Sequence, residues 1–249
     1  MSLPEHFTPS AGLLDGRAIM ITGATGGLGR ALAVECARAG ASVILSGRNG
    51  AMLDRVYDEI EALDAPRPAI ALLDLATATA VEYDRVAGTV GDEFGKLDGL
   101  VHAAALLGDR TPLEQYDVPT WCRVLHVNLT APFILTQVML PNLRKSTDAS
   151  IIFVSSSVVT NPRPYWGAYA VSKAGLESVR SMLSQELEGE ENIRVNSINP
   201  GRMRTRMRAA AYPAEDPSTL PSPASLTGPF LYLLSAQGRD IDGEYLDAQ

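Results

Sequence analysis

A serine cluster, a tyrosine and a lysine lie close together in the stretch of residues 150–173. An apolar run ends in three serines, a loop with Pro and Gly follows, and the next segment has the period of a helix carrying Tyr169 and Lys173. Residues four apart share one face of a helix, so the phenol and the ammonium can act at one point. A nearby cation favours the phenolate, which is needed because the ordinary tyrosine pKa is about 10. This pair is therefore the candidate reaction centre, for moving a proton to or from an oxygen atom.

Strand-like and helix-like segments alternate along the chain and must position this pair. The expected strands are 18–22, 42–46, 69–74, 97–104, 151–156, 193–198 and 244–246, and the expected helices are 28–40, 50–63, 77–94, 115–143, 168–187 and 223–236. The alternation predicts an α/β doubly wound (Rossmann) three-layer sandwich, with a mostly parallel seven-stranded sheet and helices on both faces. Ligands of such sheets bind at the carboxyl ends of the strands, where the serine cluster and the start of the Tyr169 helix fall.

The 249 residues are expected to form one domain. Residues 1–16 have no clear period and indicate an extended arm, and residues 17–249 a single dinucleotide-binding and catalytic domain. Residues 202–228 are rich in proline and break the alternation, which is typical of a substrate lid. Within them, four arginines alternate from Arg202 to Arg208. Either they are solvated, or one or two line the pocket and favour an anionic substrate or a pyrophosphate.

Composition narrows the possible partners and compartment. A formal charge of −8 argues against a nucleic-acid or anionic-membrane surface. The two cysteines, Cys36 and Cys122, fall in helical patterns and are expected to be buried, in a reducing, cytoplasmic compartment. The N-terminus does not read as a signal peptide, and no run of 18 apolar residues occurs. His102 and His126 are expected to be packed side chains, and no metal site is predicted.

Residues 22–29, TGATGGLG, lie where the first strand passes into a helix. Glycine permits a turn with positive φ and a close approach of backbone N–H groups to a pyrophosphate, beside the positive end of the helix. The loop is therefore a candidate dinucleotide site; a plain glycine turn is the alternative. The predicted contacts within it are Gly23, Thr25, Gly26, Gly27, Leu28 and Gly29.

The ends of the second and third strands should meet the adenosine half of the dinucleotide. An acidic residue after the second strand would bind a free ribose 2′-hydroxyl, but Arg48 and Asn49 stand there instead and are predicted to bind the cofactor. A guanidinium suits a 2′-phosphate, so NADP(H) is predicted over NAD(H), unless Arg48 is simply solvated. Asp74 can accept a hydrogen bond from the adenine amino group or cap the following helix.

These motifs resemble the short-chain dehydrogenase/reductase family, in its compact single-domain branch. The resemblance covers about residues 17–247 and rests on the glycine loop, Asp74-Leu75, HVNLTAPF with Asn128, Tyr169-x-x-x-Lys173 and NPGRMRT with Pro200, Gly201 and Thr205. The family spacing of 13 residues before the tyrosine selects Ser156 from the three serines. The chain departs from the family's N-A-G after the fourth strand, where it has Ala103, Ala104 and Ala105.

The resemblance implies a Ser-Tyr-Lys(-Asn) active site for hydride transfer between NADP(H) and a ketone, aldehyde or secondary alcohol. It implies that Ser156 holds the substrate oxygen, that Tyr169 is the acid/base, and that Lys173 binds the nicotinamide ribose. It also implies that Asn128 lies at a helix break and holds a relay water, and that Leu75, Ala103, Ala104, Pro200, Gly201 and Thr205 contact the cofactor.

The resemblance further implies a homodimer or homotetramer through the long helices near 115–143 and 168–187. Trp166 and Tyr212 are candidate pocket walls, whereas Trp121 is as readily a core residue. The alternative function is a dinucleotide-binding regulator or scaffold without turnover.

Overall fold

The computed structural model describes residues 7–249, and within them the strands form one seven-stranded sheet. The strand order is β3-β2-β1-β4-β5-β6-β7, and all neighbours are parallel. The strands are β1 (Ala18–Thr22), β2 (Ser42–Gly47), β3 (Ala69–Leu72), β4 (Gly99–His102), β5 (Ala149–Val154), β6 (Ile193–Asn199) and β7 (Tyr245–Asp247). The predicted doubly wound fold is confirmed.

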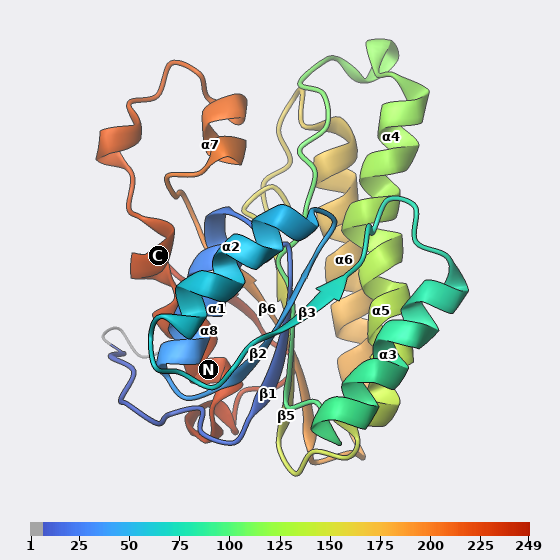
Figure 1. The fold of residues 1–249 in the computed structure, drawn as a ribbon. Coiled ribbons are helices and arrows are strands. Elements are labelled where there is room, and N and C mark those ends of the chain that lie inside the picture. Colours follow the sequence, from blue (N-terminus) through green and yellow to red (C-terminus); the bar gives the residue numbers. More distant parts are fainter. Residues whose placement is uncertain (1–6) are drawn as a thin grey trace.

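Helices cover both faces of the sheet (Figure 1). One apolar core lies between the sheet and α1 (Gly27–Arg38), α2 (Gly50–Glu61) and α8 (Gly228–Leu234). The other lies between the sheet and α3 (Ala80–Phe94), α5 (Ala131–Leu143) and α6 (Gly167–Glu186). The strands are apolar along most of their length because both of their faces are buried.

The strand order reverses between β1 and β4, which pair with each other at the centre of the sheet. The chain crosses from β1 through α1 to β2 on one side, and from β4 to β5 on the other. This reversal opens a crevice beyond the carboxyl ends of the two strands. The short helix α7 (Arg206–Ala211) and the segment after it lie above this end of the sheet (Figure 1).

The predicted long helix near 115–143 is divided in three. α4 (Val118–Leu125) passes through a π-helical turn at His126–Thr130 into α5. Together, residues 118–143 are long and apolar enough to cross a membrane. Their most apolar window of 18 residues has a mean hydropathy of 1.3, and 44% of that window is buried inside the molecule. One such helix is weak evidence for a membrane span, and here α5 packs on the sheet as a core helix.

Several other boundaries differ from the sequence-based prediction. The expected helix at 77–94 begins at Ala80, because Thr79 and Glu82 form a reciprocal capping box. The expected helix at 223–236 is a 3₁₀ turn at Pro223–Leu226, then α8 and a further 3₁₀ turn at Ala236–Gly238. Two more 3₁₀ turns occur at Leu113–Gln115 and Pro217–Thr219.

The predicted N-terminal arm is partly outside the described residues, which begin at residue 7. The described part is folded back rather than extended. Residues 11–16 form turns, and the Leu14 side chain is fully buried in the first core. The Leu14 amide also donates to the carbonyl of Ala39 at 2.7 Å, which fastens this segment to the end of α1.

Candidate active site

Tyr169, Lys173 and Ser156 converge above the end of β5. Tyr169 and Lys173 lie on the first two turns of α6 and are 8% and 2% exposed. The Lys173 ammonium donates to the carbonyl of Val154 at 2.6 Å, and its Nζ lies 5.8 Å from the centre of the Tyr169 ring. Ser156 follows β5 in a tight turn and forms a hydrogen bond with the Tyr169 hydroxyl. The structure thus brings the three predicted groups together.

The two titratable groups respond to burial in opposite directions. Burial raises the pKa of Tyr169, and the hydrogen bond with Ser156 only partly opposes this. Burial lowers the pKa of Lys173 to about 8, and the carboxylate of Glu177, one turn further along α6, opposes that fall. The predicted lowering of the tyrosine pKa is therefore wrong for the protein alone, because desolvation of the phenolate dominates. Near neutral pH Tyr169 is a neutral proton donor beside a cation.

Asn128 lies in the π-helical turn, at a break in the helix, and is 1% exposed. Its Oδ1 accepts a hydrogen bond from the Leu106 amide, and its Nδ2 donates one to the Leu106 carbonyl, both at 2.8 Å. Nδ2 also donates to Ser172 Oγ at 3.1 Å. Ser172 Oγ in turn donates to the Tyr169 carbonyl. The side chain therefore ties the loop after β4 to α6, and both of its N–H donors are used in doing so. The water relay implied by the resemblance stays a prediction.

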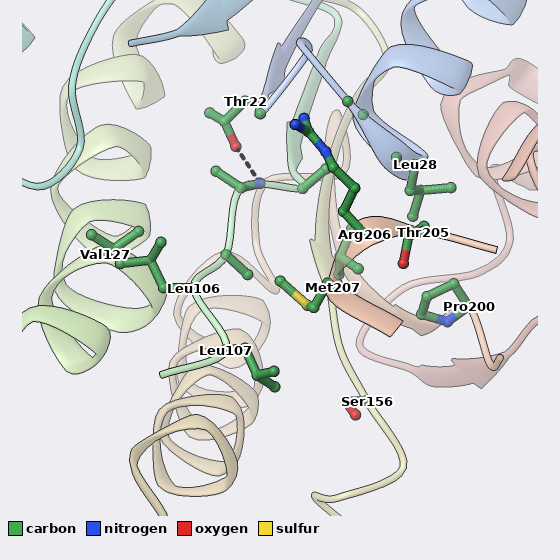
Figure 2. A pocket seen from close by; sticks show the side chains of 18 of the residues that line it. Thr22, Leu28, Leu106, Leu107, Val127, Ser156, Pro200, Thr205, Arg206 and Met207 are labelled. Carbon is green, nitrogen blue, oxygen red and sulfur yellow. Dashed lines mark hydrogen bonds between the residues drawn. The ribbon is translucent and has the colours of Figure 1, made fainter. Parts of the chain in front are cut away.

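The loop of residues 22–29 forms a narrow turn between β1 and α1. Gly23 has φ +68°, and a Cβ there would come within 2.8 Å of the Ala104 backbone. A Cβ on Gly29 would lie 2.3 Å from the Gly23 carbonyl oxygen. Both positions therefore require glycine. The Thr22 hydroxyl binds the amide of Ala104 at 3.2 Å and the carbonyl of Val101 at 3.4 Å, so a tie between β1 and β4 is kept despite the Ala103–Ala105 departure (Figure 2).

The N-terminus of α1 is open toward the crevice. The capping residue is Gly26, and within residues 7–249 no side chain caps this helix and its first turn has no acidic residue. A Cβ on Gly26 would meet the guanidinium of Arg206 at 3.3 Å, and one on Gly27 would meet the Thr205 methyl at 3.3 Å. Figure 2 shows the Arg206 side chain extending across the pocket toward this loop. The free N–H groups, the helix dipole and a guanidinium together suit a pyrophosphate.

The predicted adenosine end of the site lies at the residues after β2 and β3. Arg48 is exposed and lines the crevice. Asn49, predicted to bind the cofactor, caps α2 by accepting from the Met52 amide at 3.1 Å, and it is not among the described residues that line the crevice. Asp74 accepts from the Ala76 amide at 3.0 Å. The alternative role of Asp74 as a helix cap is wrong, because Thr79 caps α3.

The segment after β6 is held by the end of the chain. Gln249 donates from Nε2 to the carbonyls of Pro200 and Arg202, each at 2.8 Å. Gly201 has φ +74°, and its amide donates to Asn199 Oδ1 at 3.1 Å. Thr205 caps α7 by accepting from the Arg208 amide. Sequence reasoning missed Gln249, for which the sequence pattern carries no signal.

All but two of the predicted site residues line a single crevice of about 750 Å³. It is lined by the predicted glycine-loop residues, Arg48, Asp74, Leu75, Ala103, Ala104, Ser156, Tyr169, Lys173, Pro200, Gly201 and Thr205. Asn128, like Asn49, is not among its lining residues. On the tyrosine side the crevice has further walls that sequence reasoning missed: Leu106, Leu107, Met207 and Ala211. Apolar residues in a sequence do not by themselves indicate a pocket wall. These four line the crevice because the fold brings the loop after β4 and α7 to the same side of it.

Several residues outside the crevice have simple roles. His102 stacks on Phe153 with ring centroids 4.9 Å apart and binds Thr136, and burial lowers its pKa to about 3, so it is a packed residue as predicted. Trp121 packs edge-on against Tyr116. Cys36 is buried, but the expectation that Cys122 is buried is wrong: it lies on the exposed side of α4. Within the described chain no group of three or more metal-ligating side chains is found.

The chain matches known proteins along nearly its whole length. Residues 17–216 match the model of the short chain dehydrogenase family. The chain is 41% identical to the oxidoreductase YciK of Escherichia coli K12, over 98% of this chain and 96% of the relative. A short chain dehydrogenase structure from Pseudomonas syringae superposes with a TM-score of 0.96 at 47% identity, covering 98% of this chain and 99% of the other. One from Shigella flexneri in complex with NADP has a TM-score of 0.94 at 41% identity, covering 96% and 100%.

Proposed function

The chain belongs to the short-chain dehydrogenase family of oxidoreductases, and on this basis we propose that it reduces a ketone or aldehyde with NADPH, or oxidises a secondary alcohol with NADP⁺. The observation that carries the proposal is the convergence of Ser156, Tyr169 and Lys173 at the carboxyl edge of β5, beside a crevice suited to a dinucleotide. Burial keeps Tyr169 protonated at neutral pH, so its hydroxyl can act as the acid in a reduction.

In the proposed reduction, Ser156 Oγ and the Tyr169 hydroxyl hold the carbonyl oxygen of the substrate. NADPH bound in the crevice would supply the hydride that the carbonyl carbon accepts, and would itself be oxidised to NADP⁺. Tyr169 donates its proton to the carbonyl oxygen, which completes the alcohol. The developing phenolate is stabilised by the Lys173 ammonium and by the hydrogen bond with Ser156. Lys173 would also hold the hydroxyl groups of the nicotinamide ribose.

The residues of the crevice fit the proposed cofactor. The open N-terminus of α1 would hold the pyrophosphate with Gly26 and Gly27, and Arg206 would contact the same group. Arg48 would bind the 2′-phosphate, and the preference for NADP(H) draws support from the relative of Shigella flexneri, which is complexed with NADP. Asp74 keeps a free lone pair for the adenine amino group after binding Ala76.

The alternative is a dinucleotide-binding scaffold without turnover. The deciding experiment is a panel of ketones, aldehydes and secondary alcohols, followed by NADPH absorbance, with binding of NADPH and NADH titrated in parallel. Turnover of any carbonyl that Tyr169→Phe abolishes would support the oxidoreductase. Tight binding of NADPH without turnover of the whole panel would favour the scaffold.

The remaining features of the proposal concern assembly and setting. We propose a single domain spanning residues 17–249, with residues 202–228 as the substrate lid, working on a small molecule rather than on nucleic acid or a membrane. A homodimer or homotetramer through the long helices fits the exposed Phe133, Val171 and Met182 on α5 and α6. A cytoplasmic location fits two free thiols, one of them exposed.

A further inference from the structure

The wall around the Tyr169 ring is apolar and comes from three separate segments. Tyr169 packs in one cluster with Val158, Trp166 and Ala211, and Leu107 and Met207 pack against that cluster. Figure 2 shows Leu106, Leu107 and Met207 on the side of the pocket that faces Ser156. A substrate whose carbonyl reaches Tyr169 must therefore lay its body against hydrocarbon and aromatic surface.

Arg208 brings a positive charge to this side of the crevice, and Glu215 offsets it. Arg208 Nε and Nη2 donate to the two carboxylate oxygens of Glu215, at 2.5 and 2.6 Å. The Arg208 guanidinium also lies 3.7 Å from the centre of the Tyr212 ring. The hydrogen bond from Arg208 lowers the pKa of Glu215, so the carboxylate is charged at neutral pH. This bidentate pair occupies one edge of the guanidinium and neutralises its charge.

A second arginine, Arg110, contacts two residues of the apolar wall around Tyr169. Its guanidinium lies 4.4 Å from the centre of the Trp166 ring, and its Nη1 donates to the Ala211 carbonyl at 2.6 Å. Arg110 thus joins the loop after β4 to Trp166 and to α7, and it does not line the crevice itself. On the lid, Arg206 reaches the glycine loop, as described above, and Arg204 lines the crevice from an exposed position.

We propose that this side of the crevice takes an uncharged ketone or aldehyde with an apolar body, and that Glu215 excludes anionic carbonyl compounds by cancelling the charge of Arg208. The inference rests on the proposed carbonyl reduction and adds to it a substrate class and a specificity-determining residue. For Arg208, it favours an uncharged substrate over the anionic one that the alternating arginines had suggested. An anion placed here would lose its water and meet a guanidinium that is already paired.

Matched carbonyl pairs that differ only by a carboxylate test the substrate class. Acetophenone is compared with 4-acetylbenzoate, and cyclohexanone with 4-oxocyclohexanecarboxylate, each by kcat/KM with NADPH. We expect the neutral member to exceed the anionic one by at least about tenfold. A preference for the anionic member would overturn the inference while leaving the proposed reduction standing. If neither member is turned over, the proposed function fails and the inference falls with it.

The role of Glu215 is tested in Glu215→Gln, which removes the charge and keeps the shape. We expect the anionic-to-neutral ratio of kcat/KM to rise by at least about tenfold, and the rise to be lost in Glu215→Gln/Arg208→Ala. Glu190→Gln is the matched control, because Glu190 forms the same two-point pair with Arg144 away from the crevice. An unchanged ratio in a folded Glu215→Gln protein would show that Glu215 does not set specificity. Should that variant not fold, the wild-type pairs still test the substrate class.

Discussion

Lys173 Nζ lies 5.8 Å from the centre of the Tyr169 ring, one helical turn away, and donates to the carbonyl that ends β5. The contact fixes the ammonium between the sheet and the phenol, where water has little access. Desolvation in this position raises the pKa of Tyr169, which keeps the phenol protonated, and lowers the pKa of Lys173 to about 8. At neutral pH the pair therefore consists of a neutral phenol beside an ammonium cation.

Tyr169→Phe should remove the proton donor and leave the fold intact, since the ring still packs against Trp166. General acid catalysis contributes about 10²–10⁴-fold, so kcat should fall by that factor. NADPH oxidation with a turned-over carbonyl measures the loss, and NADPH binding should persist. Tyr165→Phe is the control, because Tyr165 is 55% exposed on the preceding loop. Equal kcat in Tyr169→Phe and wild type would exclude Tyr169 as the acid.

The rate of reduction should fall as the pH rises through about 8, because the Lys173 ammonium is lost there. Glu177→Gln should move this descending limb to lower pH. The carboxylate of Glu177 raises the lysine pKa against the effect of burial, so its removal lets that pKa fall further. The pH profile of kcat/KM measures both effects. A limb that stays in place or moves to higher pH would contradict this assignment.

Arg48→Ala should weaken NADPH binding without weakening NADH binding. A charge-assisted hydrogen bond contributes about 1.5–3 kcal/mol, which is about 10–100-fold in Kd. Fluorescence titration of both dinucleotides provides the measurement, and Arg85→Ala, an exposed arginine on α3, is the control. Wild-type protein that binds NADH more tightly than NADPH would refute the proposed role of Arg48.

Asn128→Ala should destabilise the protein and reduce activity together. The substitution leaves the amide and the carbonyl of Leu106 without their partner, and each buried unsatisfied group costs about 1–3 kcal/mol. Urea unfolding measures the stability, and Asn161→Ala on the exposed loop after β5 is the comparison. If the two variants unfold at the same urea concentration, the two hydrogen bonds between Asn128 and Leu106 do not contribute to stability.

Arg194→Met should destabilise the fold while sparing kcat. Arg194 is buried at the opposite end of the sheet and binds Asp148, which also pairs with Arg17. Removing one partner of a buried pair costs about 3–5 kcal/mol. Urea unfolding and steady-state kinetics at a permissive temperature separate the two effects. A fall in kcat comparable to the loss of stability would argue against a purely structural network.

This network also gives stability a pH dependence. Burial alone would raise the pKa of Asp148, but Arg194 and Arg17 outweigh it, and the net pKa is lowered. A lowered carboxyl pKa stabilises the fold above the unfolded value of about 3.9, and that contribution is lost as the pH falls through the folded value. Wild-type stability should therefore fall on acidification below about pH 4, and less steeply in Arg194→Met. Unfolding curves between pH 3 and 6 test the difference.

Local sequence patterns determined much of this protein. The apolar runs predict the parallel strands, since a strand buried on both faces must be apolar throughout, and the alternation with helices determines the topology. The glycines at 23 and 29 are determined by a turn that leaves no space for a Cβ. Tyr169 and Lys173 could be paired from the sequence because a helix brings residues four apart together regardless of the rest of the fold.

Tertiary structure alone decided the features that depend on loops and distant segments. The periodic pattern of a helix or strand gives no information about where an irregular segment such as residues 202–228 lies. The pairing of Arg208 with Glu215 and the position of Arg206 beside Gly26 therefore could not be predicted from their spacing. The same holds for the apolar wall around Tyr169, to which Leu107 and Met207 contribute from separate segments. The sequence therefore predicts the candidate reaction centre, which lies on one helix and one strand end. The charge and shape of the crevice beside Tyr169 arise where separate segments pack together.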